Sequence, residues 1–199
     1  MLKTWSIRAC MLALVTLFAM LPHSAFGSRV VRLDAFGGLA GLFNLAQGTV
    51  RIVSIISPTC PSCRKALGDI SAVMSEFPTT RLRAYVVFVP QDEDDSVFRA
   101  LERVKEFDER RAVYFWDAGG VVRNAWADIV ESETPLWHML ALYDTDAQFR
   151  DAPAPGSWVH MHDHADSPPL ERTVLAEHVR VMLDRLEAMR RDAGNSEKP

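Results

Sequence analysis

Cysteine is scarce in this chain, with three among 199 residues. Cys10 lies in an N-terminal segment that we expect to be removed, so the exported protein would keep only Cys60 and Cys63. A structural zinc site takes four ligands, and two cysteines supply at most half of such a set. The lack of a third cysteine therefore excludes an all-cysteine zinc centre.

Long apolar runs are missing beyond residue 27, and no remaining stretch is long enough to cross a membrane.

Positively charged residues are also fewer than negatively charged ones. Once Lys3 and Arg8 leave with the first 27 residues, 20 basic residues stand against 26 acidic ones, a net charge of −6. Nothing in this balance favours binding to nucleic acid or to an anionic membrane surface.

The first 27 residues have the pattern of a secretory signal peptide. Two basic residues accompany an apolar core, Ala9 to Leu21, that is too short to span a bilayer comfortably. Ala25-Phe26-Gly27 then offers small residues at both positions that a signal peptidase reads, so we expect cleavage after Gly27. An uncleaved membrane anchor is the alternative. Residues 28–199 would form one exported domain in an oxidising compartment, the periplasm if the source is bacterial.

Strands alternate with helices along this domain. Beta-branched and aromatic runs predict strands, and apolar residues at three- and four-residue steps predict helices. We expect strands over 51–56, 82–89, 112–116 and 136–143, a short hairpin strand at 148–150, and helices over 60–77, 97–107, 121–130 and 170–191. Residues 39–45 are expected to form a short apolar turn, and residues 160–169 an irregular segment. The order predicts an α/β fold whose central mixed, mostly parallel sheet carries helices on both faces.

The motif Cys60-Pro61-Ser62-Cys63 follows the first strong strand and opens the first long helix. Pro61 falls in the first helical turn, where a proline has no hydrogen bond to lose. The spacing brings both sulfurs onto that turn, and the first sulfur faces unpaired N–H groups at the positive end of the helix dipole. This setting stabilises the thiolate, the attacking species in disulfide exchange. We interpret Cys60 as the nucleophile and Cys63 as the resolving cysteine. A zinc half-site and an inert structural disulfide remain open as alternatives.

Over roughly residues 50–149 the chain resembles the thioredoxin-like superfamily. The resemblance depends on the cysteine motif after a strand, on Thr134-Pro135 ahead of the strand 136–143, and on the segment Leu140 to Phe149. It implies a thioredoxin-like fold with a core over about 50–150 and a C-terminal helix over about 170–191. It also implies that Pro135 has a cis peptide bond and lies against the active-site disulfide, and that Thr134 pairs with a bound peptide.

Two positions depart from thioredoxin itself. Thr59 stands where a tryptophan usually precedes the first cysteine, and Ser54 stands where thioredoxin has a buried acidic residue that helps to move the proton of the second cysteine. The chain is more similar to exported thioredoxin-like and redoxin proteins, several of which carry counterparts of Phe115-Trp116-Asp117 and Trp158-Val159-His160. The acidic run 92–95 is interpreted as a solvated loop that leads into a helix.

Three histidines alternate at His160, His162 and His164. In an extended segment alternate side chains share a face, so three imidazoles there could bind copper or zinc. The alternative is a solvated polar loop, in which exposed histidines carry no energetic cost. His138 follows Trp137 in a predicted strand and is interpreted as a packed core histidine.

These observations predict an exported thiol–disulfide oxidoreductase that acts through Cys60 and Cys63, with Thr134 and Pro135 binding substrate. No cofactor is expected. Its partners would be protein thiols or disulfides and a redox partner that recharges the site, with no nucleic acid and no membrane except through an uncleaved signal. The alternative function is a periplasmic copper chaperone or sensor that uses the cysteine pair and the cluster His160, His162 and His164. A third is a binding module whose disulfide is structural.

Overall fold

The computed structural model describes residues 29–107, 109–162, 164 and 166–196. The expected signal peptide and its cleavage site after Gly27 lie outside the described residues. Among the helices that are described, none is both long and apolar enough to cross a membrane.

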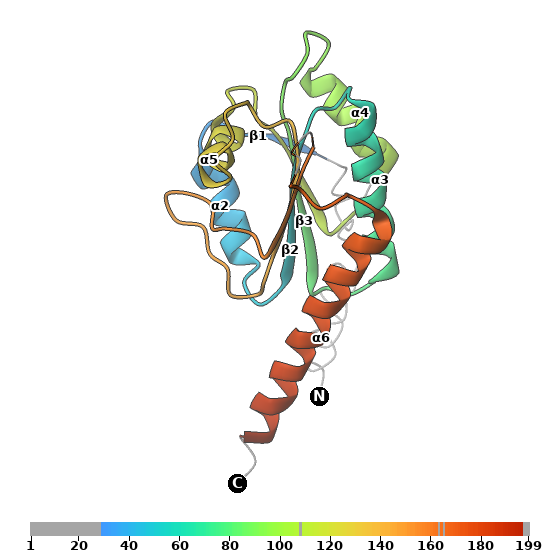
Figure 1. Ribbon diagram of the computed structural model, residues 1–199, viewed down its shortest axis with the longest axis vertical. Coiled ribbons are helices and arrows are strands. Elements are labelled where there is room, and N and C mark those ends of the chain that lie inside the picture. Colours follow the sequence, from blue (N-terminus) through green and yellow to red (C-terminus); the bar gives the residue numbers. More distant parts are fainter. Residues whose placement is uncertain (1–28, 108, 163, 165, 197–199) are drawn as a thin grey trace, which may run out of the picture.

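One six-stranded sheet runs through the centre of the domain in the order β1-β4-β3-β2-β5-β6 (Figure 1). Strands β1 to β4 pair in parallel, whereas β5 runs antiparallel to β2 and β6 antiparallel to β5. The mixed, mostly parallel sheet that the sequence predicts is therefore confirmed. The strands are β1 (Val30–Arg32), β2 (Val50–Ile56), β3 (Leu82–Phe88), β4 (Ala112–Trp116), β5 (His138–Tyr143) and β6 (Trp158–Met161).

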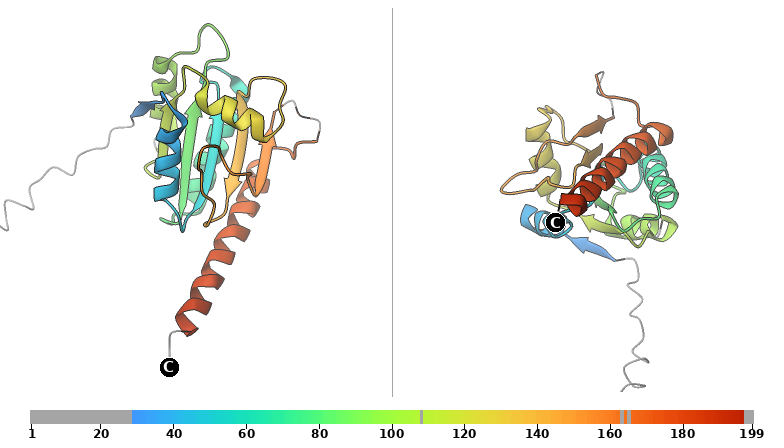
Figure 2. Two further views of the ribbon diagram at one scale, coloured as in Figure 1. Left: turned by 90° about the vertical axis from the view of Figure 1, so that its left-hand side faces the viewer. Right: turned by 90° about the horizontal axis from the view of Figure 1, so that it is seen from below.

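Five helices cover the sheet on both faces. Helices α2 and α5 lie on one face, and α3, α4 and α6 lie on the other (Figures 1 and 2). Because apolar side chains of the helices pack against both faces of the sheet, every residue of β2 and of β5 is buried. The helices are α2 (Phe36–Leu45), α3 (Pro61–Glu76), α4 (Val97–Phe107), α5 (Val121–Ile129) and α6 (Arg172–Ser196).

The last strand is not where the sequence predicts it. Residues 148–150 form no strand; β6 instead lies at Trp158–Met161, within and just before the segment expected to be irregular. The backbone of Phe149 is satisfied by a side chain: Asn44 Nδ2 donates to its carbonyl at 2.7 Å, and Asn44 Oδ1 accepts from its N–H at 2.9 Å. The Phe149 ring stacks on Phe43 with centroids 3.7 Å apart. Because Asn44 already satisfies the backbone N–H and C=O groups of Phe149, this residue needs no partner in a sheet. The strand that pairs with the free side of β5 is β6.

Helix α2 is also longer than the short apolar turn expected near residues 39–45, because Leu39, Ala40 and Phe43 form a buried face against the sheet. Strand β5 begins at His138, two residues later than expected. Both differences arise at element ends, where long-range packing outweighs the local pattern.

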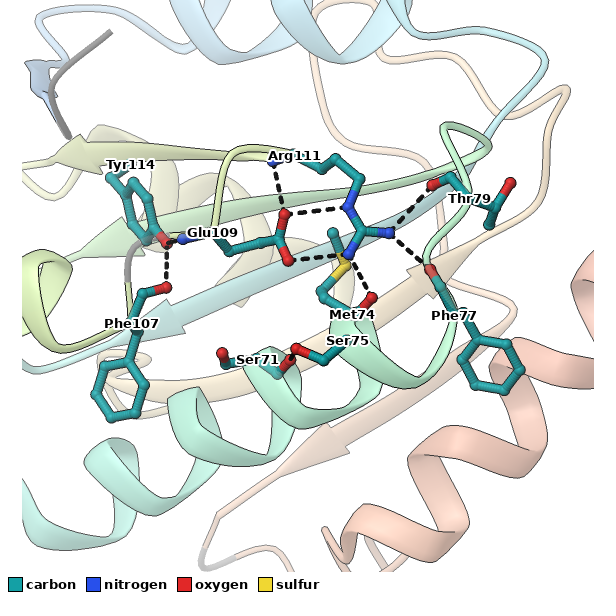
Figure 3. Close-up of polar contacts among 9 residues, drawn as sticks. All are labelled: Ser71, Met74, Ser75, Phe77, Thr79, Phe107, Glu109, Arg111 and Tyr114. Carbon is teal, nitrogen blue, oxygen red and sulfur yellow. Dashed lines mark hydrogen bonds and ion pairs between the residues drawn. The ribbon is translucent and has the colours of Figure 1, made fainter. Parts of the chain in front are cut away.

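The C-terminal end of α3 is held by a side chain from the loop before β4 (Figure 3). The Arg111 guanidinium donates to the carbonyl oxygens of Phe77 at 2.6 Å and Thr79 at 3.1 Å, and also to that of Met74. Its remaining donors reach the Glu109 carboxylate at 2.9 and 3.0 Å. Carbonyls that the helix end leaves without a helical partner are thereby satisfied, and the far end of the helix that starts at the cysteine motif is fixed.

Candidate active site

Cys60 occupies the N-cap of α3, four residues after β2 ends, and Pro61 is the first helical residue. Cys60 is half-buried and Cys63, one turn into the helix, has an exposed fraction of 0%. Both are free thiols. The predicted position of the pair at a helix start is confirmed, with the first cysteine partly exposed and the second buried.

The Cys60 sulfur makes two hydrogen bonds within its own helix turn. The Cys63 backbone N–H donates to Cys60 Sγ at 3.2 Å, and Ser62 Oγ lies 3.0 Å from the same sulfur. The sulfur therefore takes the role that a serine or aspartate oxygen plays at other helix starts.

The Cys63 thiol is held in its protonated form. Burial raises the pKa of Cys63 well above its ordinary range, and the hydrogen bond to Cys60 and the charge of Cys60 act in the same direction. The backbone N–H of Ser57 opposes them. The thiol donates to the Trp137 carbonyl oxygen at 3.5 Å. The two cysteines thus differ in exposure and in hydrogen-bond partners.

A buried carboxylate shapes the segment that leads into the motif. Asp95 accepts from the Ser57 hydroxyl at 2.9 Å, from the Thr59 hydroxyl at 2.7 Å and from the Thr59 N–H at 3.1 Å, and two further N–H groups come from Gln91 and Asp92. Burial acts to raise the pKa of Asp95, but the hydrogen bonds, led by that of Thr59, outweigh burial and lower it. The carboxylate is therefore ionised at neutral pH.

The interpretation of residues 92–95 as a solvated acidic loop is correct for the first three and wrong for Asp95, whose exposed fraction is 9%. Nothing in the run of four acidic residues distinguishes the one that turns inward. Ser54, where thioredoxin has a buried acid, donates its hydroxyl to the Met139 carbonyl at 3.1 Å. In this chain a buried acid near the pair comes from the loop after β3 instead.

The resemblance-based expectation for Pro135 needs correction. The described residues contain no cis peptide bond, so the Thr134–Pro135 bond is trans, and both residues are exposed. The chain continues through buried Leu136 before β5 begins, and the backbone group that meets Cys63 is the carbonyl of Trp137. The same carbonyl accepts from the Ser57 N–H at 3.0 Å.

His138 is buried, as expected of a core histidine, but its place is beside the cysteines. Its Nδ1 lies 3.3 Å from Ser62 Oγ, and its ring stacks on His162 with centroids 4.8 Å apart. The ring of His160 is 5.5 Å away, and His160 Nδ1 donates to the Pro168 carbonyl at 2.6 Å. Burial lowers the pKa of His160, so this side chain is neutral at pH 7.

The cluster of His160, His162 and His164, which the alternative function would use to bind a metal, is not what the fold assembles. Within the described part of the chain, one set of three metal-ligating side chains has its ligand atoms all within 4.8 Å of one another, and it consists of Cys60, Cys63 and His138. Sequence reasoning missed His138 because its partners lie 75 or more residues away, and an apolar strand offers no local sign of them.

The sequence matches no protein-family model and no curated protein. Among solved structures, the fold is similar to a thiol:disulfide interchange protein of the thioredoxin family from Chlorobium tepidum TLS, with 14% identity and a TM-score of 0.52 over 70% of this chain and 83% of that one. It is also similar to a secreted Mycobacterium tuberculosis disulfide oxidoreductase homologous to E. coli DsbE (16% identity, TM-score 0.45, 69% and 85% covered). A third similar structure is the pneumococcal exposed lipoprotein thioredoxin Etrx1 from Streptococcus pneumoniae strain TIGR4, with 12% identity and a TM-score of 0.46 over 69% of this chain and 87% of that one. The first likeness confirms a thioredoxin-like fold.

Proposed function

We propose that this chain, a thioredoxin-like fold with a Cys-X-X-Cys pair, is an exported thiol–disulfide oxidoreductase that exchanges disulfides with cysteines of other proteins. One observation carries the proposal: a half-buried Cys60 whose sulfur receives helix-start donors lies next to a fully buried Cys63 that keeps its proton. A structural disulfide does not require this asymmetry, whereas stepwise exchange does.

In the reducing direction, the Cys60 thiolate attacks one sulfur of a partner disulfide. A mixed disulfide forms, and the other partner sulfur leaves as a thiolate. Cys63 then loses its proton and attacks Cys60 Sγ. The Cys60–Cys63 disulfide forms, the bond between Cys60 and the partner sulfur breaks, and that sulfur leaves and takes up a proton to give the second partner thiol. Two electrons have passed to the partner, and the reverse sequence oxidises a dithiol. A second redox protein, by the same exchange, returns the pair to its starting state.

The substrate would lie along the chain between Thr134 and Trp137. Thr134 and Pro135 are exposed and precede the Trp137 carbonyl that contacts Cys63, so an extended peptide reaching Cys60 would pass along them. We keep Thr134 and Pro135 as proposed substrate-binding residues and add Trp137 to them. Backbone groups in such a segment are suited to pair with any peptide sequence.

Export remains part of the proposal. Residues 1–27 have the composition of a signal peptide, and a reactive cysteine pair holds its disulfide in an oxidising compartment. Two of the similar proteins are described as secreted and as an exposed lipoprotein, respectively. Amino-terminal sequencing of the protein expressed from its full gene would check this, with Ser28 as the expected first residue.

Capture of partners by Cys63→Ser tests the function. Without the resolving thiol, the mixed disulfide on Cys60 persists, so we expect covalent adducts with partner proteins that dithiothreitol releases. The double variant Cys60→Ser, Cys63→Ser is the matched control and should form none. In parallel, a titration in glutathione buffers should show a reversible two-electron couple for the unaltered pair. Absence of the couple, together with absence of adducts to a model protein disulfide, would contradict the proposal.

A further inference from the structure

We infer that the reduced form of this site binds Cu(I) through Cys60 Sγ, Cys63 Sγ and a ring nitrogen of His138. The inference goes beyond disulfide exchange and rests on the proposed function only for the reduced, dithiol state of the pair. The observation behind it is that these three side chains bring their ligand atoms within 4.8 Å of one another.

The spacing suits a three-coordinate ion. With metal–sulfur and metal–nitrogen bonds of about 2.0 to 2.3 Å, the ligand atoms of a planar three-coordinate site lie roughly 3.5 to 4 Å apart. The present separations are at most 4.8 Å, so small side-chain rotations close the site.

The ligands come from elements whose relative position is fixed. The cysteines belong to the first turn of α3, and His138 is the first residue of β5. In the sheet His138 is directly opposite Ile56, the last residue of β2, from which the chain runs into the motif. The metal-free protein therefore already holds the three donors in place, which reduces the cost of ordering them on binding.

The surroundings of His138 orient its ring. Ser62 Oγ lies 3.3 Å from Nδ1, His162 stacks on one ring face at 4.8 Å, and the ring of His160 is 5.5 Å away. Contacts of this kind around a metal-binding histidine fix the ring position and contribute to affinity. They also explain why histidines gather around a cysteine pair without themselves joining the ligand set.

The donor set favours Cu(I) over harder ions. Two thiolates and one imidazole are soft or borderline ligands, which select Cu(I) or zinc rather than magnesium, calcium or manganese. Zinc prefers four ligands, and the set that the described residues assemble has three. Binding releases the protons of the two thiols and moves no electrons, and formation of the Cys60–Cys63 disulfide consumes both sulfurs. Copper would therefore bind the reduced protein and be excluded from the oxidised one.

The test is an anaerobic competition for Cu(I) between the reduced protein and a chromogenic Cu(I) chelator. We expect one ion per chain, an affinity more than about tenfold lower for His138→Gln, and no binding after oxidation to the disulfide. His164→Ala is the matched control, because His164 is an exposed histidine outside the ligand set, and it should bind as the unaltered protein does. A parallel titration with Zn(II) should show weaker binding than Cu(I).

Two further measurements keep the outcomes distinct. X-ray absorption of the unaltered Cu(I) protein should show two sulfur ligands and one nitrogen ligand, a result that does not depend on how any variant folds. A sulfur-only environment, or Cu(I) binding lost in His164→Ala but kept in His138→Gln, would overturn the inference. The redox couple and the Cys63→Ser adducts report on disulfide exchange separately, so either function can fail while the other stands.

Discussion

At the level of single side chains, the site depends on groups whose environments differ sharply over a few ångströms. Cys60 is half-buried with donors around its sulfur, whereas Cys63 is fully covered and has a raised pKa. Asp95 is buried and yet ionised, because five hydrogen-bond donors compensate its charge. The segment that leads into the Cys60–Cys63 motif, Ser57 to Thr59, is therefore held in place by the carboxylate of Asp95, which lies outside the motif.

Replacing Asp95 with asparagine should destabilise the protein in a pH-dependent way. Hydrogen bonds to a charged acceptor contribute about 1.5 to 3 kcal/mol each at most, and an amide keeps some of them, so we expect a loss of about 2 to 4 kcal/mol at pH 7. Folding lowers the pKa of Asp95. The stability that its ionised form contributes is therefore complete above the ordinary aspartate pKa of about 3.9, and it is lost as the pH falls through the lower pKa of the folded protein.

Urea unfolding of both proteins between pH 7 and pH 3 measures this difference. The difference in the free energy of unfolding between the unaltered protein and Asp95→Asn should become smaller below about pH 4, where Asp95 begins to take up a proton in the unfolded chain. Asp94→Asn is the control, because the neighbouring Asp94 side chain is exposed and should leave the free energy unchanged within about 0.5 kcal/mol. A gap that stays constant across this range would contradict the assigned role.

At the level of elements, helix α3 carries the motif at one end and is held by Arg111 at the other. Its buried face is apolar, with Ala66, Leu67, Ile70, Val73 and Met74 packed against the sheet and neighbouring helices. Pro78 follows the C-cap residue Phe77 and ends the helix as expected. The carbonyls left at that end receive donors from Arg111 (Figure 3). The position of the cysteines therefore depends on contacts at both ends of one helix.

Arg111→Met should lower the free energy of unfolding by about 2 to 4 kcal/mol, because it leaves several partly buried carbonyls without their donor and removes the guanidinium that pairs with the Glu109 carboxylate. Arg111→Lys should recover only part of this, since one ammonium cannot reproduce the planar set of guanidinium donors. Chemical denaturation measures both. Arg110→Met, at the exposed neighbouring arginine, is the control, and an equal effect there would show that charge rather than capping matters.

At the level of the whole molecule, the two ends of the central strands have different roles. Cys60 follows β2, Asp95 follows β3 and His138 begins β5, so these groups meet at the carboxyl ends of β2 and β3, because β5 runs antiparallel to β2. Near the opposite end of β2, Arg51 has an exposed fraction of 0%. It donates to the carbonyls of Phe43 at 3.3 Å and Ala147 at 2.9 Å and also to that of Asp144.

Arg51 thus joins α2, β2 and the segment after β5, and its guanidinium lies over the Phe43 ring with Cζ 4.2 Å from the centroid. Arg51→Met keeps much of the side-chain volume but removes donors from three carbonyls, so we expect a loss of about 3 to 5 kcal/mol. The thermal unfolding midpoint and urea unfolding measure it. Arg83→Met is the control, because Arg83 is the exposed residue paired with Arg51 on β3, and a similar loss there would contradict this role.

The linear chain was sufficient for the features that depend on near neighbours. The order of elements from β2 to β5, the buried face of α3, its end before Pro78 and the place of the cysteines at its start follow from residue type and spacing. Strand β1 and helix α2 were not predicted from these patterns. These patterns act within one or two turns of backbone, so no partner from elsewhere is required to recognise them.

Other features depended on contacts between distant segments. His138 joins the cysteines because β5 pairs with β2, Asp95 turns inward because Ser57 and Thr59 offer donors to it, and β6 forms because β5 leaves an open edge. Trp137, not Pro135, meets Cys63 because two more residues precede β5. Whether a polar side chain is buried is governed by the partners that folding brings to it, and several of those partners are distant in sequence.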